Sequence, residues 1–299
     1  SPSGKAALDY FLGRGLSMST IKHFGLGYAP DSWDSLIRHL KSKGFSMAEM
    51  FDANLVKRSE RDGKSRYYDN FRNRVMTPII DLRGNVIAFG GRVMDDSKPK
   101  YLNTSDTLVY KKSMGVFALN LAKKSGKDSL ILCEGYMDVI ALHQAGFDNA
   151  VASLGTALTS GHASLLKRYA KEVYITYDSD KAGVKAVLRA IPILKEVGIT
   201  TKVVNMRPYK DPDEFIKALG ADAYQERIDN ANNSFMFEIS VLEEQYDMKD
   251  PQSKTLFYNE IAQKLLIFTE ELERNNYIQA VADKYKIDFG DLRKLVNNH

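Results

Sequence analysis

Acidic side chains follow two strand-like segments of this sequence at the point where each segment ends. Glu134 comes directly after the apolar run 130–133, and a helix-like run starts four residues later. Asp178 and Asp180 come at the end of the run 172–177, and another helix-like run follows them. Because the carboxyl ends of parallel strands meet at one edge of a sheet, we expect the three carboxylates to converge there. Carboxylates that lie so close repel one another and raise each other's pKa unless a cation joins them.

A cluster of hard oxygen ligands of this kind suits Mg²⁺ or Mn²⁺, with phosphates completing the coordination shell. An Asp-x-Asp pair alone is weak evidence, since most such pairs are turns or helix caps. The combination of Glu-Gly at one strand end with Asp-x-Asp at a later one is more specific. Asp211 and Asp213 follow a further strand-like run near 201–204 and are candidate ligands of the same site. An equally good interpretation of this pair is a helix cap, with Pro212 in the first turn of the helix.

The segment 128–219 must hold these acids in place, and it alternates between strand-like and helix-like patterns. This alternation predicts right-handed βαβ units with a mostly parallel sheet, and therefore an α/β fold. The predicted strands lie near 129–133, 150–153, 172–177 and 201–204, and the predicted helices lie near 138–145, 159–170, 181–197 and 213–219.

The flanking regions differ from this segment in pattern and in charge. Residues 1–127 combine short helices with a predicted hairpin, and they hold 22 Lys and Arg against 12 Asp and Glu, a net charge of +10. The remaining residues hold 20 against 26, a net charge of −6. We predict three domains: a basic mixed α+β domain at 1–127, a metal-binding domain at 128–228 and a helical domain at 229–299. A basic part beside an acidic part suggests phosphate-bearing ligands between them, although charge also clusters on solvated faces without any ligand.

The composition of the 299 residues is that of a soluble globular protein, with 44% hydrophobic and 27% charged residues. No run approaches the ~20 apolar residues of a membrane span, so we expect no membrane partner. Cys133 is the only cysteine, which excludes an internal disulfide and a Cys-based zinc site. A cytoplasmic protein is the simplest expectation.

The motifs Glu134-Gly-Tyr-Met-Asp138, Asp178-Ser-Asp180 and Lys210-Asp-Pro-Asp-Glu214 resemble the TOPRIM motifs of bacterial replicative primases of the DnaG type. The basic part carries independent similarities to the same family, at 14–16, 26–30, 71–79, 89–92, 99–103 and 110–113. The resemblance extends to about residue 219 and is weak in the helical tail. Two positions depart from the family's pattern: Ser179 replaces the usual Gly, and Thr77 replaces the Phe of many members.

This resemblance implies the RNA polymerase core of a primase, which makes short RNA primers on single-stranded DNA from ribonucleoside triphosphates. It implies catalytic roles for Glu134, Asp178 and Asp180, and two or more Mg²⁺ or Mn²⁺ ions held by these acids together with Asp211 and Asp213. It leaves open whether Glu134 is a metal ligand or the proton acceptor. Family members also carry a zinc domain and a domain that contacts the replicative helicase, and we expect both to be absent from this chain.

Basic residues supply the candidate contacts with phosphate groups. Arg72, Arg74 and Arg92 lie among aromatic residues, a composition that can hold a single DNA strand by phosphate contacts and stacking. A solvated hairpin is the alternative interpretation. The candidates for the nucleotide triphosphate are Arg14, Lys100, Asn103 and Lys112. A site that recognises phosphates more than bases would also accept guanosine alarmone nucleotides, which we expect to be inhibitors.

Two other functions stay open at this stage. A TOPRIM nuclease or topoisomerase-like enzyme would use the same acids, although a topoisomerase also needs a tyrosine nucleophile on a further domain, for which the chain leaves no room. A non-catalytic DNA-binding mediator of recombination would use the fold only as a scaffold.

Overall fold

The computed structural model describes residues 2–61 and 63–299 and divides the chain into two compact units. The first unit ends at Ala231, and the second comprises Asn232–His299. The first unit therefore contains both the basic region 1–127 and the region 128–228 that the sequence predicts to bind metal. The boundary between those two regions stays a prediction.

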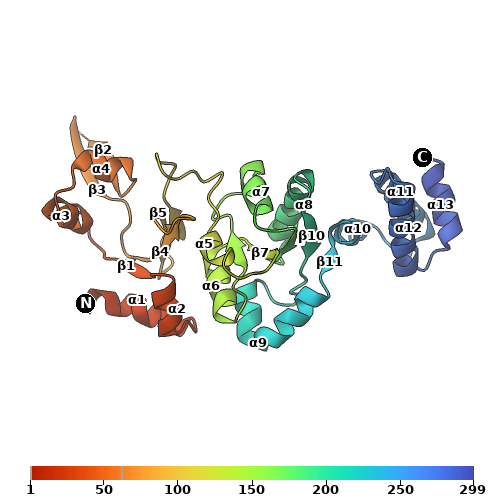
Figure 1. Cartoon of the computed structure of the whole chain (residues 1–299), viewed down its shortest axis with the longest axis horizontal. Helices are drawn as coiled ribbons and strands as arrows, with labels where there is room; N and C mark the ends of the chain where they lie inside the picture. Colours follow the sequence, from red (N-terminus) through yellow and green to blue (C-terminus); the bar gives the residue numbers. More distant parts are fainter. Residues whose placement is uncertain (1, 62) are drawn as a thin grey trace. The chain divides into compact units, whose positions relative to one another are not determined.

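A four-stranded antiparallel sheet organises the basic half of the first unit (Figure 1). Its strand order is β1-β4-β5-β6, and a separate hairpin pairs β2 with β3. The strands of this half are β1 (Gly27–Ala29), β2 (Val56–Arg61), β3 (Lys64–Asp69), β4 (Arg74–Ile80), β5 (Val86–Val93) and β6 (Tyr101–Asn103). The helices are α1 (Pro2–Gly13), α2 (Met18–His23), α3 (Ser35–Ser42), α4 (Met47–Asp52) and α5 (Leu119–Ala122).

The turn between β4 and β5 follows from its residues. Asp81 accepts hydrogen bonds from the backbone N–H groups of Arg83 and Asn85 at 2.9 and 2.8 Å. Gly84 has a φ of +93°, a conformation that glycine adopts without steric cost. The hairpin that the sequence predicts is thus confirmed. The sequence pattern did not predict β1 or β6, because each has only three residues and is held by pairing with β4 or β5.

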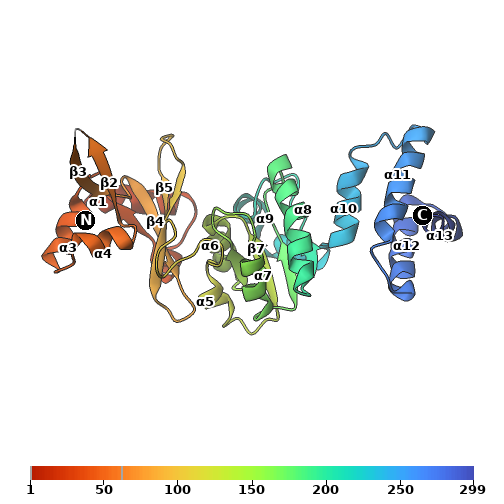
Figure 2. The same cartoon turned by 90° about the horizontal axis from the view of Figure 1, so that it is seen from above.

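A parallel sheet forms the second half of the first unit and confirms the predicted α/β fold. Its strands β10 (Thr200–Val203), β9 (Glu172–Ile175), β7 (Ser129–Cys133) and β8 (Ala150–Ala152) lie side by side in that order. Helices α7 (Ser160–Lys167) and α8 (Lys181–Glu196) lie on one side of the sheet, and α6 (Tyr136–Gln144) and α9 (Pro212–Asp229) lie on the other (Figure 1). Figure 2 shows the same arrangement from above.

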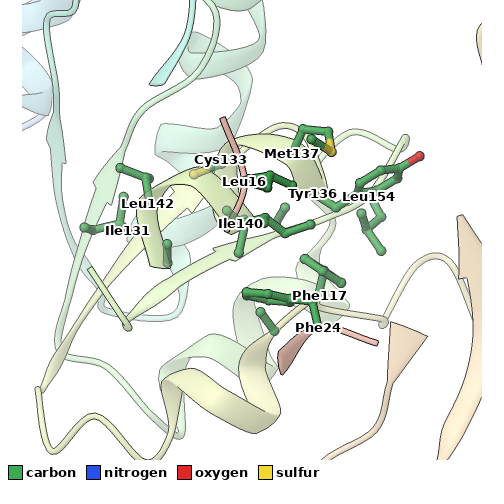
Figure 3. Close-up of a cluster of buried hydrophobic side chains, with 14 of the residues drawn as sticks. Leu16, Phe24, Phe117, Ile131, Cys133, Tyr136, Met137, Ile140, Leu142 and Leu154 are labelled. Atoms are coloured by element: carbon green, nitrogen blue, oxygen red, sulfur yellow. The ribbon is translucent and has the colours of Figure 1, made fainter. Parts of the chain in front are cut away.

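A continuous cluster of buried apolar side chains joins the two halves of the first unit (Figure 3). Ile140 of α6 is completely buried, and Phe24 and Phe117 from the basic half stack with their ring centroids 6.0 Å apart. Burying an apolar side chain of this size stabilises the fold by about 1.5–3 kcal/mol. Leu16 belongs to the same cluster, so the core fixes the chain next to Arg14 against the parallel sheet.

The region 116–122 is helical only over its second half. Only Leu119–Ala122 forms a helix, whereas Phe117 makes an isolated bridge with Ala152 at the edge of the parallel sheet. The backbone N–H of Phe117 donates to the carbonyl of Ala152 at 2.8 Å, so tertiary pairing replaces the first helical turn.

The second unit is helical, as the sequence predicts. It contains the two-residue strand β11 (Asn232–Asn233) and the helices α10 (Ser234–Glu243), α11 (Pro251–Leu265), α12 (Glu271–Tyr285) and α13 (Phe289–Asn297). Asp250 and Asp288 cap α11 and α13 with their side chains, and Pro251 is the first residue of α11. Phe257 and Ile261 are completely buried in the core of this unit. Within the described part of the chain, no helix is long and apolar enough to cross a membrane.

Candidate active site

Glu134 and Asp178 lie at the same edge of the parallel sheet, as the strand register requires. Leu132 of β7 is opposite Ile175 of β9, and each acid follows the end of its strand. The Oε1 atom of Glu134 accepts a hydrogen bond from the backbone N–H of Asp178 at 3.1 Å. The two strand ends are therefore joined directly at the predicted site.

Helices α6 and α9 bring further acids to the same edge. Asp138 lies in the first turn of α6, and its Oδ1 accepts from the backbone N–H of Asp213 at 3.4 Å. Asp211 caps α9 through a hydrogen bond of 2.8 Å from the backbone N–H of Glu214. A cavity of about 420 Å³ is lined by five carboxylate residues, Glu134, Asp138, Asp178, Asp211 and Asp213. The same cavity is lined by the basic residues Arg14, Arg92, Lys100 and Lys210.

Burial and mutual repulsion shift the pKa of the acids in this cavity. Burial raises the pKa of Glu134, and the charge of Asp178 raises it further. Burial likewise raises the pKa of Asp178, while the ammonium of Lys210 opposes the shift. Burial raises the pKa of Asp138 well above the usual range, and the charges of Asp211 and Asp178 add to the effect.

The acids suit a divalent cation in their chemistry and electrostatics, but within the described residues their side chains are not arranged around a common metal position. Carboxylate oxygens are hard donors, and the raised pKa values of Glu134, Asp138 and Asp178 reflect a free-energy cost of ionisation that a cation would relieve. Across residues 2–61 and 63–299, no three His, Cys, Asp or Glu side chains are grouped closely enough to hold a metal ion. In this structure the carboxylates instead accept from backbone N–H groups and pair with basic side chains.

Asp213 differs from the other acids because two basic side chains already occupy one of its oxygens. Its Oδ2 lies 2.6 Å from Nη2 of Arg14 and 2.8 Å from Nζ of Lys217, and its side chain is only 9% exposed. An oxygen that binds two cationic groups is a poor site for a further cation. We therefore interpret Asp213 as a residue that positions Arg14, and the metal-ligand role expected from the sequence stays a prediction.

Asp180 does not line the cavity, although its charge contributes to the raised pKa of Glu134 and of Asp178. It is exposed, and its Oδ1 caps α8 by accepting from the backbone N–H of Gly183 at 2.8 Å. Asp180 thus caps a helix in this structure, whereas Asp178 lines the cavity, and the catalytic and metal-binding role expected of Asp180 stays a prediction.

Three of the four predicted nucleotide contacts line the cavity: Arg14, Lys100 and Asn103. The Nε atom of Arg14 and the Oδ1 atom of Asn103 are buried and have no hydrogen-bond partner within the described residues. Buried polar atoms normally have partners, so two unpaired atoms beside a cavity indicate a ligand site. Lys112 does not line the cavity, and its carbonyl is bound by the His162 ring at 2.8 Å.

The three predicted DNA-binding arginines do not form one surface. Arg72 is partly exposed, with its guanidinium 3.9 Å from the ring centroid of Trp33. Arg92 lines the cavity between the rings of Tyr10 and Tyr101.

Arg74 has a structural role that the sequence did not reveal. It is only 6% exposed, and its guanidinium donates to the carbonyls of Pro99 at 2.7 Å and Lys100 at 3.3 Å. These bonds support the chain beside Lys100, and the DNA-binding role expected of Arg74 stays a prediction.

Sequence reasoning missed three residues of functional interest: Asp138, Lys210 and Trp33. Asp138 and Lys210 belong to the acidic motifs, but their positions in the cavity depend on the placement of α6 and α9. Trp33 is 63% exposed and stacks on Arg72, a contact between residues 39 positions apart that no local pattern indicates.

Two family models match the sequence. The DNA primase catalytic core, N-terminal domain, matches residues 1–123, and a Toprim-like model matches residues 131–216. The Toprim domain of primases is metal-dependent in general. Among curated proteins, the DNA primase of Clostridium acetobutylicum is 42% identical over 305 residues, covering 99% of this chain and 50% of the relative. The chain spans about half the length of the curated relatives that it matches.

Solved structures of primase catalytic domains have the same fold. A DNA primase domain from Pseudomonas aeruginosa is 35% identical with a TM-score of 0.78, covering 98% of this chain and 92% of that domain. A DnaG primase catalytic domain bound to single-stranded DNA is 33% identical with a TM-score of 0.80, covering 97% and 92%. The RNA polymerase domain of Mycobacterium tuberculosis primase DnaG, in complex with a DNA duplex that has a 6-nucleotide overhang, is 30% identical with a TM-score of 0.82, covering 93% and 89%.

Proposed function

Because the chain belongs to the family of DnaG-type DNA primases, as their catalytic core, we propose that it synthesises short RNA primers on single-stranded DNA. The observation that carries the proposal is the cavity of about 420 Å³, which carboxylates from two parallel strand ends share with Arg14 and Lys100. Such a cavity provides both hard oxygen ligands and positive charge for a triphosphate. Both are required for metal-assisted nucleotidyl transfer.

In the proposed reaction, the 3′-hydroxyl of one ribonucleotide attacks the α-phosphate of the next, and pyrophosphate leaves. Arg14 and Lys100 bind the triphosphate and offset its charge, while Asp213 holds the Arg14 guanidinium in place. Asn103 supplies an unpaired acceptor for a hydroxyl or amino group of the nucleotide. Template sequence is read by base pairing, so the protein needs to grip only the backbone of the DNA.

We propose that Glu134, Asp178 and Asp211 hold two or more Mg²⁺ or Mn²⁺ ions, with Asp138 beside them. When bound, these ions lower the pKa of the attacking hydroxyl and offset charge on the leaving pyrophosphate. Glu134 either coordinates an ion or accepts the proton of the hydroxyl. Its raised pKa makes it a better proton acceptor, and a bound cation would relieve the cost of ionising it.

For the template strand, Arg72 and its stacked Trp33 are the candidate contact outside the cavity, and Arg92 is the candidate contact inside it. A guanidinium that already stacks on an indole ring has little side-chain freedom left to lose. Its binding to a phosphate therefore costs less conformational entropy. A relative of this chain has been solved with single-stranded DNA bound, which supports the proposal.

Further partners follow from the family and belong to the same proposal. The replicative helicase is one proposed partner. Guanosine alarmone nucleotides would compete for the phosphate-binding groups of the cavity. The proposed setting is the cytoplasm.

Incubation with single-stranded DNA, labelled ribonucleotides and Mg²⁺ or Mn²⁺ tests the proposed function. RNA products that depend on the template and on the divalent ion are expected. Cleavage of the DNA would instead indicate a nuclease, and binding without any product would indicate a recombination mediator. Either of those two results would contradict the proposal.

A further inference from the structure

Lys210 places a positive charge against the acids that we propose to bind metal. Its Nζ lies 3.6 Å from Oδ2 of Asp178, and 60% of its side chain is exposed. Lys210 also lines the cavity that contains Arg14 and Lys100. A monovalent cationic group therefore lies beside the acid to which a divalent ion is assigned.

The backbone of Lys210 is fixed on both sides, whereas its side chain is not. Its N–H donates to Oε2 of Glu214 at 2.6 Å, and its carbonyl accepts from the N–H of Ser179 at 2.7 Å. Ser179 follows Asp178, and Asp211 follows Lys210, so the residue is held between two segments that carry candidate ligands. The long side chain is consequently the only part of Lys210 that can move without disturbing the site.

Two kinds of ion pair can be distinguished in this cavity by distance and exposure. Arg14 and Lys217 contact Asp213 at 2.6 and 2.8 Å, and the carboxylate they share is 9% exposed. The Lys210 contact with Asp178 is longer and mostly solvated, and an exposed pair of this kind contributes little to stability. The first pairing is suited to a permanent structural role, and the second is suited to exchange.

We propose that Lys210 is the resident counter-ion of the metal-free acids, and that a divalent ion at Asp178 displaces its ammonium toward the phosphates of a bound nucleotide. This inference rests on the proposed function, because it assumes the metal and nucleotide ligands assigned above. An ammonium and a divalent ion compete for the same carboxylate and repel each other. With its backbone fixed, the displaced side chain stays near the cavity, where a triphosphate is the available anion. Metal binding and nucleotide binding are thereby coupled through one residue.

Lys210→Met in the full 299-residue chain tests this proposal without any primer synthesis, because methionine keeps much of the side-chain length but not the charge. We expect the melting temperature in EDTA to change little, since the exposed ion pair contributes little to stability. Mn²⁺ binding, measured by titration calorimetry, should become at least ~3-fold tighter, since the competitor is gone. Binding of GTP at saturating Mn²⁺ should become at least ~5-fold weaker. Unchanged or weaker Mn²⁺ binding would overturn the proposal, and so would unchanged GTP binding.

Two matched variants separate this role from the general effect of removing a positive charge. Lys217→Met removes one positive charge at Asp213, and it should change Mn²⁺ affinity less than Lys210→Met does. Lys210→Arg retains the charge and should bind Mn²⁺ and GTP as the unmodified chain does. If Lys210→Met and Lys217→Met change Mn²⁺ affinity equally, Lys210 acts only through the general electrostatic field. That result would overturn its specific role.

These binding measurements also distinguish the inference from the proposed function. A chain that shows the expected Mn²⁺ and GTP responses but makes no RNA would contradict the function and leave the role of Lys210 intact. If the chain makes RNA but its Lys210→Met variant binds Mn²⁺ no more tightly, the proposed function is supported and the role of Lys210 is contradicted.

Discussion

At the scale of single residues, the acids of the cavity divide into two groups that their sequence motifs do not distinguish. Glu134, Asp178 and Asp211 accept from backbone N–H groups or pair loosely with Lys210. Asp213 is enclosed and bound by Arg14 and Lys217. The motif Lys210-Asp-Pro-Asp thus carries one residue suited to metal and one suited to the positioning of an arginine.

The variant Asp213→Asn tests this division. Asparagine cannot neutralise Arg14, so the guanidinium loses its fixed position and the KM for ribonucleotides should rise about 10-fold, the effect of losing about 1.4 kcal/mol. Affinity for Mn²⁺ should change by less than ~3-fold, because the carboxylate is not assigned to the metal. Asp211→Asn is the matched comparison and should weaken Mn²⁺ binding instead. If Asp213→Asn weakens Mn²⁺ binding as much as Asp211→Asn does, Asp213 is a metal ligand and the division is wrong.

At the scale of elements, the site depends on sharp strand-to-helix connections at the edge of the parallel sheet. The connection from β9 to α8 requires a glycine at position 183, because a Cβ atom there would collide with the backbone carbonyl of Asp178. Ser179 is fixed by a hydrogen bond of 2.7 Å to the carbonyl of Lys210, which leaves the turn little room to adjust.

Gly183→Ala should therefore displace Asp178 while leaving the rest of the sheet folded. We expect RNA synthesis to fall more than ~10-fold and the melting temperature to fall by several degrees, as for a loss of about 1–3 kcal/mol of stability. Gly27→Ala is a suitable control, because an added Cβ at position 27 meets no atom within 4 Å. Normal Mn²⁺ binding and normal synthesis in Gly183→Ala would show that the turn does not determine the position of Asp178.

Elements with a strong local pattern could be predicted from the sequence. The alternation of apolar strands and amphipathic helices predicted all four parallel strands, and turn residues such as Gly84 predicted the β4–β5 hairpin. The strands β1 and β6 were missed because long-range pairing, rather than local sequence, determines them. The role of Arg74 was missed for the same reason: its partners, the carbonyls of Pro99 and Lys100, are more than 20 residues away.

At the scale of the whole molecule, the buried His162 and the half-buried His143 link the stability of the first unit to pH. The ring of His143 hydrogen-bonds the carbonyl of Ala150 at 2.9 Å, and the ring of His162 bonds the carbonyl of Lys112 at 2.8 Å. Burial lowers the pKa of both rings. Each histidine therefore binds a proton more readily when the chain is unfolded. The corresponding stability is present above the unfolded pKa of about 6.5 and is lost as the pH falls below it.

His162→Gln should reduce this dependence on pH. The free energy of unfolding of the unmodified chain should contain a contribution of up to about 1.4 kcal/mol per pH unit from each histidine just below pH 6.5. The variant should be less stable at pH 7.5, because it loses ring contacts, but its stability should fall less steeply between pH 7 and pH 5.5. Denaturant titrations at several pH values measure both quantities. Identical slopes in the two proteins would show that His162 titrates alike in the folded and unfolded states.

The central claim is that the cavity beside Glu134 and Asp178 is the site of nucleotidyl transfer and that template binding depends on other residues. The most direct test measures RNA synthesis and single-stranded DNA affinity on the same preparation of Asp178→Asn. We predict a fall in synthesis of at least ~10²-fold, because the charge that holds the metal is lost, with DNA affinity unchanged within about 2-fold. Retained synthesis with weakened DNA binding would contradict the account.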